Sequence, residues 1–196
     1  RRGAVSGPGT DESYITVRVH GSGAGGGEPR AGLAVTATGG GLRTEATTGS
    51  LGCAILMVTP GSGTEYTVRV SGQKDGFPYL TQRGLDQAVS VVTVAGPGGA
   101  NAADLQIDGF DPAGRLSIIV AGATAATNAV LVVSDDAGGP EPMSLPVNGG
   151  GQLAPVYLPP GRYELEVNGT NWQTPVQVTS GEQQSVVLDA SAVTGG

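Results

Sequence analysis

Short segments in which apolar and polar residues alternate recur along the whole chain, separated by clusters of glycine and proline. Residues 14–20, 66–71 and 162–168 show the pattern most clearly. A period of two residues is that of a β-strand with one buried face. The 35 glycines and 13 prolines favour turns and interrupt helices, and no segment carries an apolar stripe with the period of a helix. The chain is therefore predicted to be all-β, with little or no helix.

Strands are predicted at intervals of roughly 8–12 residues, the spacing typical of sandwiches and barrels. Segment 53–59 is almost wholly apolar, which predicts a strand that is buried on both faces or runs through the core. Residues 121–129 are the only segment for which we consider a helical turn, and Gly122 and the threonines disfavour it. The other predicted strands are 14–20, 33–38, 43–47, 66–71, 88–94, 104–107, 115–120, 128–134, 143–147, 152–158, 162–168, 174–179 and 185–189.

A glycine-rich, uncharged segment midway along the chain predicts a linker, which we place at residues 96–103. We expect a flexible N-terminal arm at 1–12, a first β-sandwich over 13–95, a second over 104–190 and a tail at 191–196. A chain of 196 residues is long enough for two sandwiches of roughly 90 residues each.

A short sequence motif that occurs twice supports this two-domain interpretation. Pro60-Gly61 precedes Tyr66-Thr-Val-Arg-Val-Ser-Gly72, and Pro160-Gly161 precedes Tyr163-Glu-Leu-Glu-Val-Asn-Gly169. Pro-Gly favours a tight turn, and the alternate positions that follow point to one face of a strand. The alternative is a chance match of a short strand motif.

These motifs resemble the transthyretin-like β-sandwich modules of the Cna-B and carboxypeptidase regulatory-like types. Glu28-Pro-Arg-Ala-Gly-Leu-Ala-Val35 fits their second element, Gly52-Cys-Ala-Ile55 their Gly-Cys strand, and Leu158-Pro-Pro-Gly-Arg-Tyr-Glu-Leu-Glu-Val167 their last strands. The resemblance covers most of residues 13–95 and 104–190. It implies two tandem immunoglobulin-like or transthyretin-like sandwiches, which serve in bacterial surface and pilin-like proteins as spacers, stalks or subunits.

One feature departs from the Cna-B pattern. Pilins of that type often carry a lysine–asparagine isopeptide bond that starts from a lysine on the first strand. Lys74 is the only lysine of this chain and lies in a predicted loop, so we expect no such cross-link. The sequence also contains no Leu-Pro-x-Thr-Gly sorting motif.

The acidic balance argues against nucleic acid as a partner. The net charge is −7, and the ten Lys and Arg residues are scattered, with only Arg1 and Arg2 adjacent, whereas phosphates are bound by clustered basic side chains. No run approaches the roughly 20 apolar residues of a membrane span. Because the sequence starts at Arg1 without methionine or a signal peptide, we expect a processed or trimmed product.

Residue types that carry catalysis are scarce. His20 is the only histidine and Cys53 the only cysteine, which excludes catalytic triads, paired histidine ligands and an intrachain disulfide. We predict that His20 is solvated. We predict that Cys53 is a small buried hydrophobic residue; the more specific alternative is a disulfide between Cys53 and another chain. We expect no enzyme and no cofactor.

Neighbouring carboxylates are interpreted as structural. Asp108, Asp111 and the pair 135–136 are predicted to form turns, since a calcium site needs six to eight oxygen ligands. Glu164 and Glu166 alternate on one predicted strand, which indicates a solvated face rather than a glycosidase pair.

Aromatic residues and one sequon complete the candidate binding residues. Phe77, Tyr79 and Trp172 are the loop candidates for a sugar platform, but Trp172 is predicted to cap its own sandwich. Asn168-Gly-Thr170 is a glycosylation sequon in a predicted turn, which makes Asn168 a candidate site if the producing cell glycosylates.

Together these features predict a non-enzymatic structural subunit, found outside the cell or on its surface. It would belong to a bacterial surface filament or be the globular part of a pilin-like protein. Its partners would be copies of itself or a companion subunit, and the arm at 1–12 could add a strand to a neighbouring sheet. Two alternatives stay open: an adhesive or carbohydrate-binding module with glycans as partners, and an accessory domain of a larger secreted enzyme.

Overall fold

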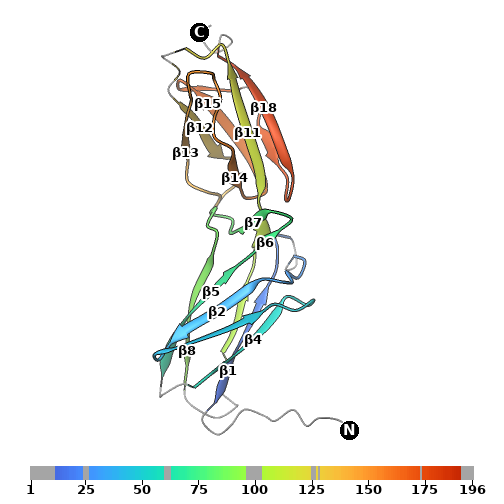
Figure 1. Cartoon of the computed structure of the whole chain (residues 1–196), viewed down its shortest axis with the longest axis vertical. Helices are drawn as coiled ribbons and strands as arrows, with labels where there is room; N and C mark the ends of the chain where they lie inside the picture. Colours follow the sequence, from blue (N-terminus) through green and yellow to red (C-terminus); the bar gives the residue numbers. More distant parts are fainter. Residues whose placement is uncertain are drawn as a thin grey trace. The chain divides into compact units, whose positions relative to one another are not determined.

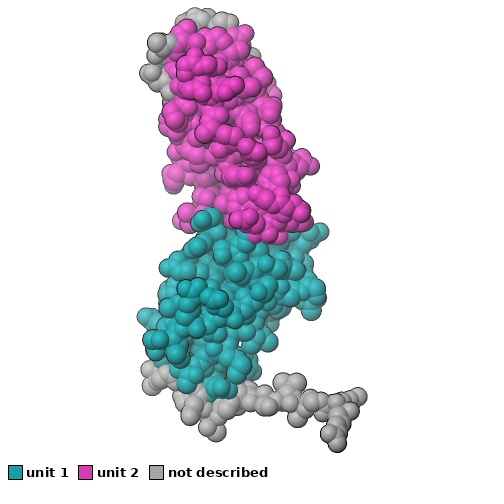
Figure 2. All heavy atoms as spheres, in the orientation of Figure 1, with its two compact units in different colours: residues 1–72, 86–110 teal, residues 73–85, 111–196 magenta. Residues whose placement is uncertain are grey.

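The structure is a computed structural model that describes residues 12–23, 27–59, 63–95, 103–124, 127, 129–172 and 174–190. No α-helix occurs among these residues, which confirms the all-β prediction. In the same residues no helix has the length and apolar character that a membrane crossing requires. The chain divides into two compact units, Arg1–Gly72 with Asp86–Phe110, and Gln73–Leu85 with Asp111–Gly196 (Figure 2).

Unit 1 is a β-sandwich of two sheets (Figure 1). Its strands are β1 (Ser13–Val19), β2 (Ala34–Gly39), β3 (Leu42–Thr47), β4 (Cys53–Val58), β5 (Thr64–Ser71), β8 (Ala88–Val94) and β9 (Ala103–Ile107). One sheet has the order β4-β1-β9 and the other β3-β2-β5-β8. β9 runs parallel to β1, whereas β4 is antiparallel to it.

The core of unit 1 is built from the alternate residues that the sequence pattern predicts to be buried. Burying each such valine or leucine side chain contributes roughly 1.5–3 kcal/mol. Tyr66 adds the largest fully buried side chain of this unit. The buried residues of β1, β2 and β5 are Ile15, Val17, Val19, Val35, Ala37, Tyr66, Val68 and Val70.

Unit 2 repeats this architecture and adds a small three-stranded sheet, β10-β7-β6. Its larger sheets are β14-β11-β18 and β13-β12-β15. On the side of β15 that faces away from β12, β16 pairs with one end of β15 and β17 with the other. β18 runs parallel to β11, as β9 does to β1. The strands are β6 (Gln73–Lys74), β7 (Phe77–Leu80), β10 (Asp111–Pro112), β11 (Gly114–Ala121), β12 (Ala129–Ser134), β13 (Met143–Pro146), β14 (Val156–Leu158), β15 (Gly161–Val167), β16 (Thr170–Asn171), β17 (Val176–Val178) and β18 (Gln183–Asp189).

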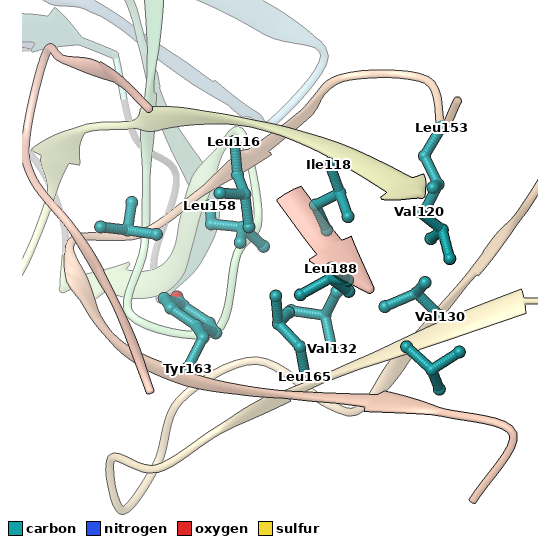
Figure 3. Packing of buried hydrophobic residues seen from close by; sticks show 12 residues of the cluster. Leu116, Ile118, Val120, Val130, Val132, Leu153, Leu158, Tyr163, Leu165 and Leu188 are labelled. Carbon is teal, nitrogen blue, oxygen red and sulfur yellow. The ribbon is translucent and has the colours of Figure 1, made fainter. Parts of the chain in front are cut away.

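Twelve buried residues form the core of unit 2 (Figure 3). Leu116 and Leu158 lie near Tyr163 at one end of this cluster, and Leu188 and Leu165 lie in its middle (Figure 3). Because residues of β11 and β18 meet residues of β12 and β15 there, the two larger sheets pack face to face. The sandwich expected from the sequence is therefore present.

The boundaries of the two units differ in two places from the expected domains at 13–95 and 104–190. The β6–β7 hairpin belongs to unit 2, where β7 pairs with β10, and β9 belongs to unit 1, where it pairs with β1. Periodicity identifies a strand, but its partner is set by contacts that are remote in the sequence. The expected arm at 1–12 and linker at 96–103 lie outside the described residues except for their last residues, and the expected tail at 191–196 lies wholly outside them.

Two hairpins of unit 2 turn on an Asp-Gly or Asn-Gly pair. Asp75 and Gly76 connect β6 to β7 with φ values of 53° and 84°, and Asn168 and Gly169 connect β15 to β16 with 50° and 78°. A two-residue type I′ turn needs positive φ at both central positions, which is why these pairs are preferred there.

β4 does not have the two buried faces predicted for segment 53–59. Leu56 is fully buried, but Ile55 and Met57 are 62% and 54% exposed, and Cys53 on the same face is only half-buried. The prediction is therefore wrong, as is that of a buried Cys53. An apolar run shows that a strand can be buried on both faces, but not that another layer covers the second face.

Candidate functional site

The single histidine of the chain lies beside a carboxylate at the end of β1. Its Nδ1 is 3.6 Å from Oδ1 of Asp108, and the His20 side chain is 21% exposed. The backbone holds the pair, because the N–H of His20 donates to the carbonyl of Ile107 and that of Phe110 donates to the carbonyl of His20. The prediction of a solvated histidine is therefore wrong, because Nδ1 of His20 is buried although the side chain as a whole is 21% exposed. The backbone of His20 also forms a bridge to that of Pro29.

The neighbouring aspartates after β12 bind an arginine of the same unit. Oδ2 of Asp135 is 3.3 Å from Nε of Arg162, and Oδ2 of Asp136 accepts a hydrogen bond from the backbone N–H of Arg162 at 3.1 Å. These contacts fix the turn that faces the start of β15. Burial, with the nearby carboxylate of Asp136, raises the pKa of Tyr163 well above its usual value.

The remaining carboxylates discussed in the sequence analysis lie on two different strands. Glu164 and Glu166 are half-buried and alternate with the buried side chains of β15, as the alternation predicts. Asp111 is buried in β10, and the residues that the structure describes contain no group of three or more His, Cys, Asp or Glu that could hold a metal ion.

The three aromatic candidates do not form one exposed platform. Tyr79 is buried in β7, and the Phe77 ring packs edge-to-face on Tyr157, with centroids 6.3 Å apart and an angle of 89°. Trp172 is partly buried against the core of unit 2, so it caps its own sandwich as predicted.

Asn168 lies exposed at the tip of the β15–β16 hairpin. Its side chain is accessible there, and glycosylation at this position remains a prediction. Lys74 is exposed on β6.

A groove of about 360 Å³ lies along one side of unit 2. None of its lining residues carries a charge, and an indole, a proline ring and two valines supply apolar surface beside hydroxyl and amide groups. The lining residues are Trp172, Thr174, Pro175, Val176, Gln177, Gln184, Ser185 and Val186.

The groove opens where a strand that is continuous in unit 1 is interrupted in unit 2. In unit 1, β8 pairs with β5 along seven consecutive residues. In unit 2 the matching position beside β15 is divided between β16 and β17, and the N–H of Trp172 donates to the carbonyl of Leu165 between them. Pro175, which lacks an N–H for the ladder, is the sequence signal that could have predicted this interruption.

No protein-family model matches the sequence, and no curated protein is similar to it in sequence. Among solved structures, the chain is similar to the Bacillus anthracis TIE protein, with 18% identity and a TM-score of 0.42 over 91% of this chain and 34% of that one. It is also similar to GBS52, the minor pilin of Streptococcus agalactiae, with 13% identity and a TM-score of 0.37 over 90% of this chain and 94% of that one. The third, the shaft pilin spaA from Lactobacillus rhamnosus GG, has 8% identity and a TM-score of 0.37 over 92% of this chain and 98% of that one. The chain thus spans about a third of the length of the TIE protein.

Proposed function

We propose that this chain is a non-enzymatic structural subunit of an extracellular bacterial filament, or the globular part of a pilin-like protein. The observation that carries the proposal is a set of large apolar side chains that strands of both units turn outward. Strands hold these side chains in fixed positions, as an assembly surface requires. The outward-facing residues are Ile55, Met57, Val89, Val91, Ile119 and Val187, which are 41–62% exposed.

The outer face of β4 and β1 gathers the largest of these side chains in unit 1. Met57 lies directly opposite Tyr14, and Ile55 lies opposite Thr16. Side chains at opposite positions of paired strands are close neighbours, so Ile55, Met57 and Tyr14 form one apolar face. Contiguous exposed apolar surface of this kind marks sites of protein association.

Unit 2 presents a similar but smaller pair. Ile119 of β11 lies opposite Val187 of β18 in the parallel ladder, and both side chains are exposed. A subunit with apolar faces on both of its units has two surfaces at which neighbouring subunits could bind. Repeated contacts between different surfaces generate filaments.

The polar groups described above support a structural role. Asp135 and Asp136 hold Arg162, and Glu164 and Glu166 lie on one strand, whereas acid–base catalysis requires groups that converge on a reacting atom.

The full chain can be tested by sedimentation velocity and negative-stain microscopy over rising protein concentration. We expect ordered assemblies, which the substitution Ile55→Asp weakens because it places a charge in the apolar face. Thr38→Asp, which adds the same charge at an exposed polar position of β2, is the matched control and should assemble as wild type. A chain that stays monomeric at every concentration would contradict the proposal.

A further inference from the structure

β18 forms one edge of its sheet, and no described strand pairs with its outer side (Figure 1). Arg115 lies opposite Gln183, and its N–H donates to the carbonyl of Glu182 at 2.9 Å. In a parallel ladder, alternate residues of a strand direct their N–H and C=O groups toward the same neighbour. The backbone groups of Gln183, Ser185 and Val187 therefore point outward from this edge.

In the part of the chain that the structure describes, this edge carries none of the usual protection. Natural edge strands are blunted by lysine, proline, bulges or inward-pointing charges. β18 reads Gln-Gln-Ser-Val-Val-Leu-Asp, with no lysine or proline and with its one charged residue at the end. An exposed edge of this kind is a template for a further strand.

The uncharged groove runs along the same edge. Gln184, Ser185 and Val186 all line it, although successive side chains of a strand point to opposite faces. Three consecutive residues can line one groove only if that groove follows the edge of the strand. The outward N–H and C=O of Ser185 therefore lie at the groove.

We propose that this groove binds an extended, uncharged peptide segment of another subunit, which adds to β18 as a further strand. The inference rests on the proposed function, because it assigns one contact between subunits. An extended peptide repeats a donor and an acceptor every second residue, as the free edge of β18 does. A sugar offers no such periodic match.

The lining determines which side chains the added strand can carry. Trp172, Pro175, Val176 and Val186 give apolar contact to the side chains that point inward. A charge there would lose its hydration without gaining a partner. Oε1 of Gln184 is buried and has no hydrogen-bond partner in the part of the chain that the structure describes, so an incoming N–H or O–H would satisfy it.

Unit 1 supplies a probe of the right chemistry. Its strand β8 reads Ala-Val-Ser-Val-Val-Thr-Val and carries no charge. A synthetic peptide of this sequence, capped at both ends and extended by two lysines for solubility, can be titrated into the full chain. Trp172 is the only tryptophan, so the intrinsic tryptophan fluorescence reports on the groove alone.

We expect a saturable change in fluorescence with this peptide. Ser185→Pro removes one outward N–H, so it should weaken binding at least about tenfold while leaving the ladder to β11 intact. Ser185→Ala keeps that N–H, so it should bind the peptide more tightly than Ser185→Pro does. A peptide in which two inward-facing valines are replaced by aspartate should bind more weakly. Circular dichroism melts establish that both variants fold.

The inference is overturned if the peptide causes no saturable change, or if a folded Ser185→Pro variant binds it as wild type does. A response to the neutral oligosaccharide maltoheptaose without a response to the peptide would also overturn it and would indicate a sugar site. If the chain forms ordered assemblies but does not bind the peptide, the inference fails and the proposed function stands. If the peptide binds and the chain stays monomeric, the proposed function fails instead.

Discussion

The hydroxyl of Tyr163 donates a hydrogen bond to the carbonyl oxygen of Pro159 at 2.8 Å, and this bond is buried. It ties β15 to the turn four residues upstream. Tyr66 is the third residue of β5, as Tyr163 is of β15, and it is equally buried. The hydroxyl of Tyr66, however, has no hydrogen-bond partner among the residues that the structure describes. Within the described part of the chain, the two tyrosines of the repeated motif thus differ in one hydrogen bond.

Replacing each tyrosine by phenylalanine should therefore have unequal effects. Tyr163→Phe leaves the carbonyl of Pro159 without its donor, and we expect the free energy of unfolding of unit 2 to fall by about 1–2 kcal/mol. Tyr66→Phe removes a hydroxyl for which the described residues offer no partner, so the stability of unit 1 should change by less than about 0.5 kcal/mol or rise. Urea denaturation measures both, with Trp172 fluorescence reporting unit 2. Equal losses for the two variants would contradict this account.

Tyr163 should also make the stability of unit 2 sensitive to alkali. Burial and the carboxylate of Asp136 raise the pKa of this phenol in the folded state, whereas an unfolded tyrosine releases its proton near pH 10. Above about pH 10 the unfolded state binds fewer protons than the folded state, so the free energy of unfolding falls as the pH rises. The loss approaches about 1.4 kcal/mol per pH unit. Urea titrations at pH 9, 10 and 11 should show it, and Tyr163→Phe should flatten the slope; an unchanged slope in that variant would refute the assignment.

The strands were largely predictable because alternation reports burial directly. Val17 and Leu165 lie in such patterns and are fully buried, since a residue two positions along a strand returns to the same face. The repeated motif also predicted that Tyr66 and Tyr163 occupy equivalent positions in their strands. A turn followed by alternating apolar residues specifies both the strand and the face of it that points inward.

Three features could not be predicted because they depend on partners that are distant in the sequence. The pairing of β9 with β1 joins segments about ninety residues apart. The outward positions of Ile55 and Met57 depend on whether another layer covers that face. The groove beside β18 depends on how the interruption near Pro175 is placed against a strand of the other sheet.

The side chain of Thr48 should be essential for the segment that leads into β2. Its Oγ1 accepts a hydrogen bond from the N–H of Leu33 at 2.9 Å and donates one to the carbonyl of Arg30 at 2.7 Å. Thr48→Val keeps the shape but leaves a buried N–H unpaired, so we expect a loss of about 1–3 kcal/mol. Faster hydrogen exchange at the Leu33 amide would identify the cause. Thr47→Val, at an exposed position one residue earlier, should change stability by less than about 0.5 kcal/mol.

Two glycines of unit 1 should respond differently to the same added methyl group. A Cβ at Gly39 would overlap the backbone carbonyl oxygen of Glu65 and lie 2.8 Å from the Tyr66 ring, whereas at Gly49 the nearest heavy atom would be 3.8 Å away. Because a backbone oxygen cannot rotate aside, Gly39→Ala must displace β2 from β5, and we expect a loss of about 1–3 kcal/mol. Gly49→Ala should be neutral or stabilise by up to about 1 kcal/mol, since alanine restricts the unfolded chain. Far-UV circular dichroism should show the loss for Gly39→Ala, while the urea transition of Trp172 in unit 2 stays unchanged. A shift of that transition of the same size would mean that the two units unfold as one.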